Sequence, residues 1–238
     1  MPTRLIPYIK VLVHLLCLIP LVVLFREFQR DELGADPVNT ITHFTGNCAL
    51  YFLLISLAVT PLRRIHSMLS NLIRFRRMLG IYAFFYATLH LATYVFLFSG
   101  YDVPTALAGL KDGHPGELVT QFELVWPTMW DDILKRRFIQ VGFAAWVILL
   151  ALAVTSPQFM LRAIGGKNWQ RLHRLVYVAA IFAVIHFWWL VKTGVRTPWK
   201  DTAVLILLLL ARVGYTALKA RRKPAALKRN ATSTPQSV

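Results

Sequence analysis

The sequence predicts an all-α integral membrane protein with six transmembrane helices, and three observations support this prediction. First, 56% of the 238 residues are hydrophobic and the mean hydropathy is +0.52, which is more apolar surface than a soluble domain of this size buries. Second, the apolar residues form six runs, each long enough to cross a bilayer. Third, Pro, Gly and charged residues are concentrated between these runs.

The six spans are justified in chain order by the residues that bound them. The first run resembles a signal peptide, but the charged stretch from Arg26 to Arg30 ends it without a small-x-small cleavage site, so we expect a retained helix. Each later run lies between connections rich in Pro, Gly or charge. The expected spans are residues 8–25, 44–60, 78–99, 138–155, 172–191 and 202–218.

Two segments outside the spans have distinctive compositions. Residues 100–137 mix Gly and Pro with aromatic residues, including Trp126 and Trp130, and we expect one or two short helices lying at the outer membrane interface. Residues 221–238 are basic and then polar, which predicts a disordered tail. The chain is therefore divided into a six-helix membrane domain, residues 1–220, and a cytoplasmic tail, residues 221–238.

The distribution of charge predicts the orientation. With the N-terminus inside, the inner segments carry 16 Lys and Arg residues and the outer segments carry nine, so both termini are expected in the cytoplasm. All 11 acidic residues fall on the outer side. Orientation in the membrane thus explains the net charge of +16 better than a nucleic-acid partner does. Cys17 and Cys48 lie within apolar runs and are expected to be packing residues.

Histidines within two of the spans are the candidate functional residues. A polar ring inside a span is costly, and it usually faces the bundle interior, where it marks an ion path, a proton relay or a cofactor. His90 in the third span and His186 in the fifth lie at matching depth, because both helices run outward and both residues lie past the middle. Two facing imidazoles are what a six-coordinate haem iron needs. The alternative is an interhelical hydrogen-bonding role.

A second pair of residues lies near the inner face. His173 is 13 residues before His186, which is about 20 Å along a helix and about 140° around it, so a bulge or bend is needed to bring both to one cavity. Arg76, 14 residues before His90, is a poor iron ligand but can pair with a haem propionate or a flavin phosphate. The alternative for Arg76 is a charge that only sets topology.

Two further histidines have simpler expectations. His14 in the first span is expected to make a hydrogen bond, with a quinone or flavin pocket as the alternative. His43 is expected to cap the second helix, with contact to a haem propionate or an outer partner as the alternative.

Five segments along nearly the whole chain carry a resemblance to a known family. They are LGADPVNTITHFTG (33–46), IRFRRMLG (73–80), ATLHLATY (87–94), WVILLALAVTS (146–156) and WQRLHRLVYVAAIFAVIHFWW (169–189). In this order they resemble the MsrQ (YedZ) family, the haem-binding membrane subunit of the periplasmic methionine sulfoxide reductase system. That family is part of the wider group of ferric reductase-like transmembrane domains.

The resemblance implies a set of cofactor sites. It implies b-type haem, with its iron held by His90 and His186 in the outer half of the membrane. It also implies an inner cofactor site at His173, with Arg76 beside it. Oxidases of the wider group hold a second bis-histidine haem there, but Arg76 stands where the other histidine would be. One haem, two haems, and an inner FMN are all left open.

The resemblance also implies an electron-transfer route in the bacterial inner membrane. Electrons would enter from the quinone pool or a cytoplasmic flavin reductase and leave to a periplasmic molybdopterin subunit that reduces methionine sulfoxide in oxidised proteins. We do not expect the FAD and NADPH domain of the oxidases after the sixth span, and we therefore expect no substrate chemistry of the chain's own. Two alternative functions are considered. One is a stand-alone transmembrane ferric or oxygen reductase, and the other is a histidine-based proton channel or transporter.

Overall fold

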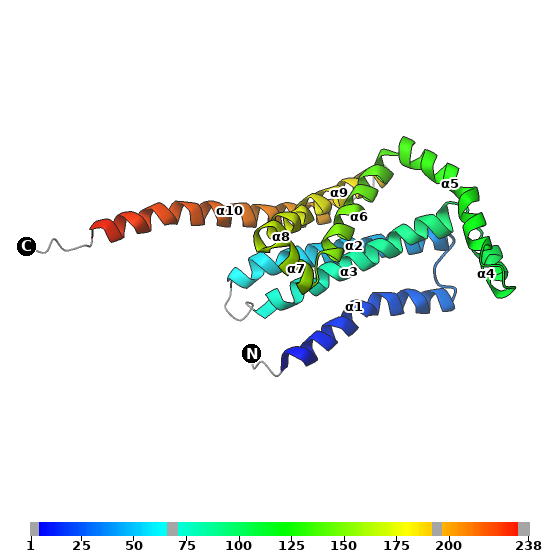
Figure 1. Cartoon of the computed structure of the whole chain (residues 1–238), viewed down its shortest axis with the longest axis horizontal. Helices are drawn as coiled ribbons and strands as arrows, with labels where there is room; N and C mark the ends of the chain where they lie inside the picture. The colour runs from blue at the N-terminus through cyan, green and yellow to red at the C-terminus, as the bar shows by residue number, and fades with distance from the viewer. Residues whose placement is uncertain (1–4, 66–70, 192–196, 233–238) are drawn as a thin grey trace, which may run out of the picture.

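The computed structural model describes residues 5–65, 71–191 and 197–232, and it confirms the all-α membrane fold (Figure 1). Six helices are long and apolar enough to span a membrane, and no strand occurs in the described residues. They match the six predicted runs, mostly with a few extra residues at the ends. Their spans are Ile6–Gln29, Pro37–Arg64, Ile73–Phe98, Arg137–Val154, Gly166–Leu190 and Pro198–Leu218.

Twelve labelled elements make up these spans and their connections in the described ranges. The spanning helices are α1 (Ile6–Gln29), α2 (Pro37–Ile65), α3 (Ile73–Thr93), α6 (Arg137–Val154), α9 (Val176–Leu190) and α10 (Thr197–Thr232). Between them lie α4 (Val103–Lys111), α5 (Glu117–Lys135), α7 (Gln158–Ile164) and α8 (Gly166–Leu172), a π-helix (Tyr94–Phe98) and a 3₁₀ turn (His173–Leu175). The backbone of α10 continues past the predicted span to Thr232.

Four helices, α2, α3, α6 and α9, provide most of the core of the bundle, and α10 adds Leu205 to it. Small residues at the contacts allow these helices to approach closely, since Ala83, Ala179 and Ala180 are fully buried. The larger Leu53 fills the space between the helices and is only 1% exposed. In Figure 1, α2 and α3 run side by side over most of their length. Large apolar side chains on the outer surface of the bundle are exposed, as expected where lipid is the solvent.

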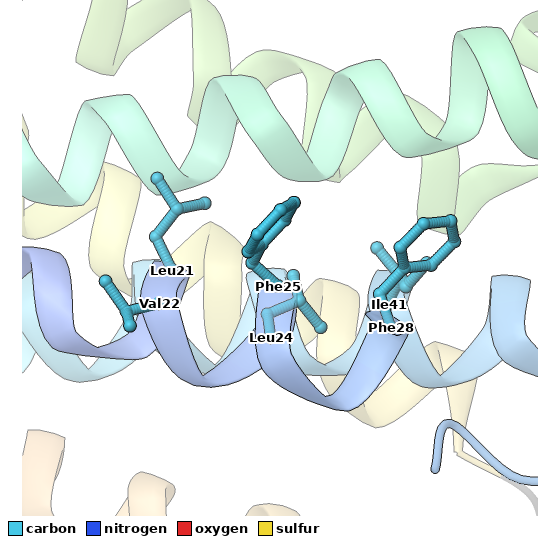
Figure 2. Close-up of a pocket in the computed structure, with 6 residues that line it drawn as sticks. All are labelled: Leu21, Val22, Leu24, Phe25, Phe28 and Ile41. Carbon is cyan, nitrogen blue, oxygen red and sulfur yellow. The ribbon is translucent and has the colours of Figure 1, made fainter. Parts of the chain in front are cut away.

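Helix α1 stands apart from the core and is tied to α3 by hydrogen bonds of Tyr82 and Tyr86. The His14 Nδ1 atom lies 2.9 Å from the Tyr82 hydroxyl, and the Tyr86 hydroxyl donates to the Cys17 carbonyl at 2.8 Å. His14 thus makes the predicted hydrogen bond. An apolar groove of about 590 Å³ lies along α1 (Figure 2), and its lining residues are Leu21, Val22, Leu24, Phe25, Phe28 and Ile41.

The start of α2 differs from the prediction. The helix begins at Pro37, and the Asp36 carboxylate accepts a hydrogen bond from the Asn39 backbone N–H at 3.0 Å, which is the geometry of a helix N-cap. His43 lies almost two turns inside the helix. Its predicted role as a cap is therefore wrong, because the Asp-Pro pair upstream starts the helix first.

The bundle has two chemically different ends. Helices α4 and α5 lie beyond one end, and α1 begins and α10 ends toward the other (Figure 1). The loop-side residues Asp36, Asp102, Asp132 and Asp201 belong to the α4–α5 end, whereas Arg63 closes α2 at the opposite end. We call this opposite end the arginine end of the bundle. The described structure fixes these relative positions, and the membrane orientation stays a prediction.

Candidate functional site

The centre of the candidate site is the pair His90 and His186, which come from different helices. His90 lies near the C-terminal end of α3 and His186 in the last turns of α9, so two helices running in the same direction place both residues at one depth. The ring centroids are 6.0 Å apart and the ring planes make an angle of 79°. The structure therefore brings together the two histidines that the sequence matched by depth.

Each histidine ring is held by a backbone carbonyl of a neighbouring helix. His90 Nδ1 lies 2.9 Å from the Thr42 carbonyl oxygen of α2, and His186 Nδ1 lies 2.7 Å from the Phe138 carbonyl oxygen of α6. A carbonyl oxygen only accepts hydrogen bonds, so each Nδ1 must carry the proton. The Nε2 atom of each neutral ring then keeps its lone pair, which is the form of imidazole that binds a metal.

A glycine on the same neighbouring helix makes room for each ring. A Cβ atom added to Gly46 of α2 would lie 3.1 Å from His90 Nδ1, and one added to Gly142 of α6 would lie 2.6 Å from His186 Nδ1. A side chain at Gly142 would therefore force the His186 ring or its surroundings to shift, and one at Gly46 would require a smaller adjustment of His90. The two glycines thus let the rings pack directly on helix backbones.

The two halves of the site repeat one arrangement. In each half the histidine follows its carbonyl partner by 48 residues, and the glycine lies four residues after that partner on the same helix. One half is built from α2 and α3, and the other from α6 and α9. This repeat, together with Gly142 and the two carbonyls, was missed in the sequence. The equal spacing is the signal that would have revealed it.

The histidine pair fits the coordination of a haem iron. Imidazole nitrogens bind metals at about 2 Å, so two rings on opposite sides of one iron have centroids roughly 6 Å apart, as these do. Both Nδ1 atoms are already oriented by carbonyls, as is typical of metal-binding histidines. No cluster of three or more His, Cys, Asp or Glu residues occurs among the described residues, so the site offers two ligands, not a protein cage.

His173 lies at the arginine end of the bundle, away from this pair. It occupies a 3₁₀ turn between α8 and α9, so the helix is irregular where the sequence required a bulge. Its ring stacks on Trp169 with centroids 3.8 Å apart, and its Nε2 atom lies 3.3 Å from the Thr155 hydroxyl. Trp169 in turn donates to the Thr155 carbonyl at 2.8 Å. These contacts orient the His173 ring through its Nε2 atom and its stacked face.

Arg76 lies near His173, in the first turn of α3, and is half-buried. Its neighbours include Tyr177 of α9 and the arginines Arg63 and Arg212. Its backbone carbonyl accepts a hydrogen bond from the Ser56 hydroxyl at 3.3 Å. The structure thus brings Arg76 and His173 to one region, separate from the His90–His186 pair.

Comparison with known proteins identifies relatives over most of the chain. A family model described as "Ferric reductase like transmembrane component" matches residues 12–184. The protein-methionine-sulfoxide reductase heme-binding subunit MsrQ of Xanthomonas oryzae pv. oryzae (strain MAFF 311018) is 43% identical over 233 residues, covering 95% of each chain. The protein of the same name from Herminiimonas arsenicoxydans is 40% identical over 221 residues, covering 92% of this chain and 90% of the relative.

Proposed function

Since the chain belongs to the MsrQ heme-binding subunit family, within the ferric reductase-like transmembrane proteins, we propose that it is an electron-transfer subunit that holds a b-type haem between His90 and His186. One observation carries the proposal. The two rings are neighbours with centroids 6.0 Å apart and planes at 79°, and each is held by a carbonyl in the tautomer that ligates iron.

The protein contributes orientation and a dry environment to this site. Bound haem would supply reversible one-electron chemistry. The carbonyls of Thr42 and Phe138 fix the ligand rings and raise their basicity. The surrounding helices exclude water and give a low dielectric, which influences the haem potential. No substrate chemistry is assigned to side chains of this chain.

A second cofactor site at the other end of the bundle forms part of the proposal. His173 and Arg76 are the residues assigned to it, with haem or FMN as the cofactor. The half-buried side chain of Arg76 and the fixed ring of His173 support the assignment, because they offer a cation and an imidazole in one region. The imidazole would serve as an iron ligand, and the guanidinium would pair with a propionate or a phosphate.

The proposed electron route runs from the arginine end to the α4–α5 end. We assign the arginine end to the cytoplasm because Lys and Arg dominate there, which places both termini inside and the chain in a bacterial inner membrane. The proposed donor is the quinone pool or a cytoplasmic flavin reductase. The proposed acceptor is a periplasmic molybdopterin subunit that reduces methionine sulfoxide in proteins.

The apolar groove beside α1 bears on the choice of donor. All six lining residues are apolar, so the groove suits an acyl or isoprenoid chain but provides no side chain that hydrogen-bonds a quinone carbonyl (Figure 2). The described lining thus supports binding of an apolar tail and leaves the site of a quinone head group unassigned.

The experiment that tests the function starts from the purified chain. A reduced-minus-oxidised spectrum with haem and flavin stoichiometry should show low-spin b-type haem. The reduced protein should then be oxidised faster by a periplasmic methionine sulfoxide reductase than by ferric chelate or oxygen. Equal or faster oxidation by the chelate or oxygen would favour a stand-alone reductase instead. A colourless protein would favour a histidine relay.

A further inference from the structure

Three arginines from three different helices converge at the arginine end of the bundle. Arg63 comes from α2, Arg76 from α3 and Arg212 from α10, and both Arg63 and Arg212 lie near Arg76. Tyr177 of α9 lies among them, with the Arg212 guanidinium carbon 4.5 Å from the centre of its ring. We refer to Arg63, Arg76, Arg212 and Tyr177 as the arginine cluster.

Buried polar atoms in this cluster lack partners within the described part of the chain. The Arg63 Nε atom and the nearby Thr60 hydroxyl are each inaccessible to solvent and make no hydrogen bond to described residues, and the equally inaccessible Tyr177 hydroxyl lies next to the Arg76 side chain. Thr60 and Arg63 are three residues apart on α2 and so lie on one face. The Arg63 Nε–H group can only donate, so the partner it lacks must be an acceptor.

No Asp or Glu side chain lies beside these charges in the described part of the chain. All 11 acidic residues lie in the segments around the α4–α5 end: Glu27, Asp31, Glu32, Asp36, Asp102, Asp112, Glu117, Glu123, Asp131, Asp132 and Asp201. Like charges held together in a helical bundle repel, and buried unpaired donors cost free energy. An anion from outside the chain would offset the repulsion between the arginines and accept hydrogen bonds from the unpaired donors.

We propose that the arginine cluster binds a phosphate group. A phosphate monoester carries up to two negative charges and three terminal oxygens, which matches several guanidinium groups and two hydroxyl donors better than a single carboxylate does. The proposal deepens the second-cofactor part of the proposed function, since it shares Arg76, and adds Thr60, Arg63, Tyr177 and Arg212 as binding residues. The phosphate belongs either to a soluble cofactor or to a membrane phospholipid.

Binding measurements on the full chain test the proposal. The protein is purified in a phosphate-free detergent and titrated with inorganic phosphate, with chloride at equal ionic strength as the reference, while thermal unfolding is followed. Two further arms identify the source. Riboflavin 5′-phosphate is compared with riboflavin, and short-chain phosphatidic acid is compared with phosphatidylcholine.

The variants Arg63→Gln and Arg212→Gln, made separately, should each weaken phosphate binding tenfold or more, and Tyr177→Phe should weaken it less. Arg64→Gln is the matched control. It removes the same charge one residue away, but the Arg64 guanidinium lies over the Tyr215 ring at 3.6 Å and is exposed. Its phosphate affinity should equal that of the unmodified chain.

The outcomes separate this inference from the rest of the function. Preference for riboflavin 5′-phosphate or for phosphatidic acid supports the site and names the source. The inference is overturned if no phosphate compound binds better than its reference, or if Arg64→Gln weakens binding as much as the cluster variants do. The haem spectrum of the His90–His186 site should be unchanged in every variant, so failure here leaves the haem proposal standing.

Discussion

His90 and His186 lie 96 residues apart in the chain, yet their imidazole rings are neighbours with centroids 6.0 Å apart. Each ring is oriented from outside by a helix that does not carry the partner histidine, α2 for His90 and α6 for His186. The pair α2 and α3 contributes only His90 to the site, and the pair α6 and α9 contributes only His186. The candidate site therefore exists only when both pairs are packed together.

Replacement of either histidine tests the pairing directly. His90→Ala and His186→Ala should each abolish the low-spin haem, because one imidazole cannot fill both axial positions of the iron. The measurement is haem content per purified chain, with the absorption spectrum. His14→Ala is the control, since His14 on α1 bonds to Tyr82 and not to either histidine of the pair in the described structure. Unchanged haem content in both site variants would refute the pairing.

The packing glycines give a graded prediction. Gly142→Ala should weaken haem affinity about 10- to 100-fold, because its Cβ would lie 2.6 Å from His186 Nδ1 and must displace an oriented ligand. Gly46→Ala should have a smaller effect, since the corresponding contact with His90 is 3.1 Å. Gly80→Ala meets only Ser56 Oγ at 3.7 Å and serves as the control. Haem titration would measure all three, and equal affinities would contradict the packing argument.

The second cofactor site predicts linked effects of two residues. Arg76→Ala and His173→Ala should alter the same cofactor, because the two side chains lie in one region and away from His90. Flavin and haem assays on both variants provide the measurement. Arg77→Ala is the control, since the Arg77 guanidinium donates to the Ser156 carbonyl at 3.1 Å. If neither Arg76 nor His173 affects any cofactor, the second site is removed from the proposal.

The orientation can be tested by labelling single cysteines. Lys111→Cys on α4 and Arg162→Cys on α7 are both exposed positions, at opposite ends of the bundle. In a background without Cys17 and Cys48, an impermeant maleimide should label position 111 from the periplasm and position 162 only after lysis of the cells. Labelling of position 162 in intact cells with a permeabilised outer membrane would invert the proposed topology.

The sequence was sufficient for much of the architecture. Hydropathy and span length located all six membrane helices, because each helix must be apolar along its own length whatever surrounds it. The depth of His90 and His186 followed from their positions in those helices. The start of α2 was placed too late, since the cap at Asp36 lies before the apolar run begins.

What the sequence by itself determined was therefore local: where the six helices lie, which connecting segments carry the acids, and which spans carry imidazoles. Tertiary structure alone decided which atoms meet. The carbonyls of Thr42 and Phe138, the bare backbone at Gly142, and the meeting of Arg63, Arg76 and Arg212 depend on how helices rotate against one another. Rotation is set by the packing of many side chains across helix contacts, and a single span of residues does not encode it.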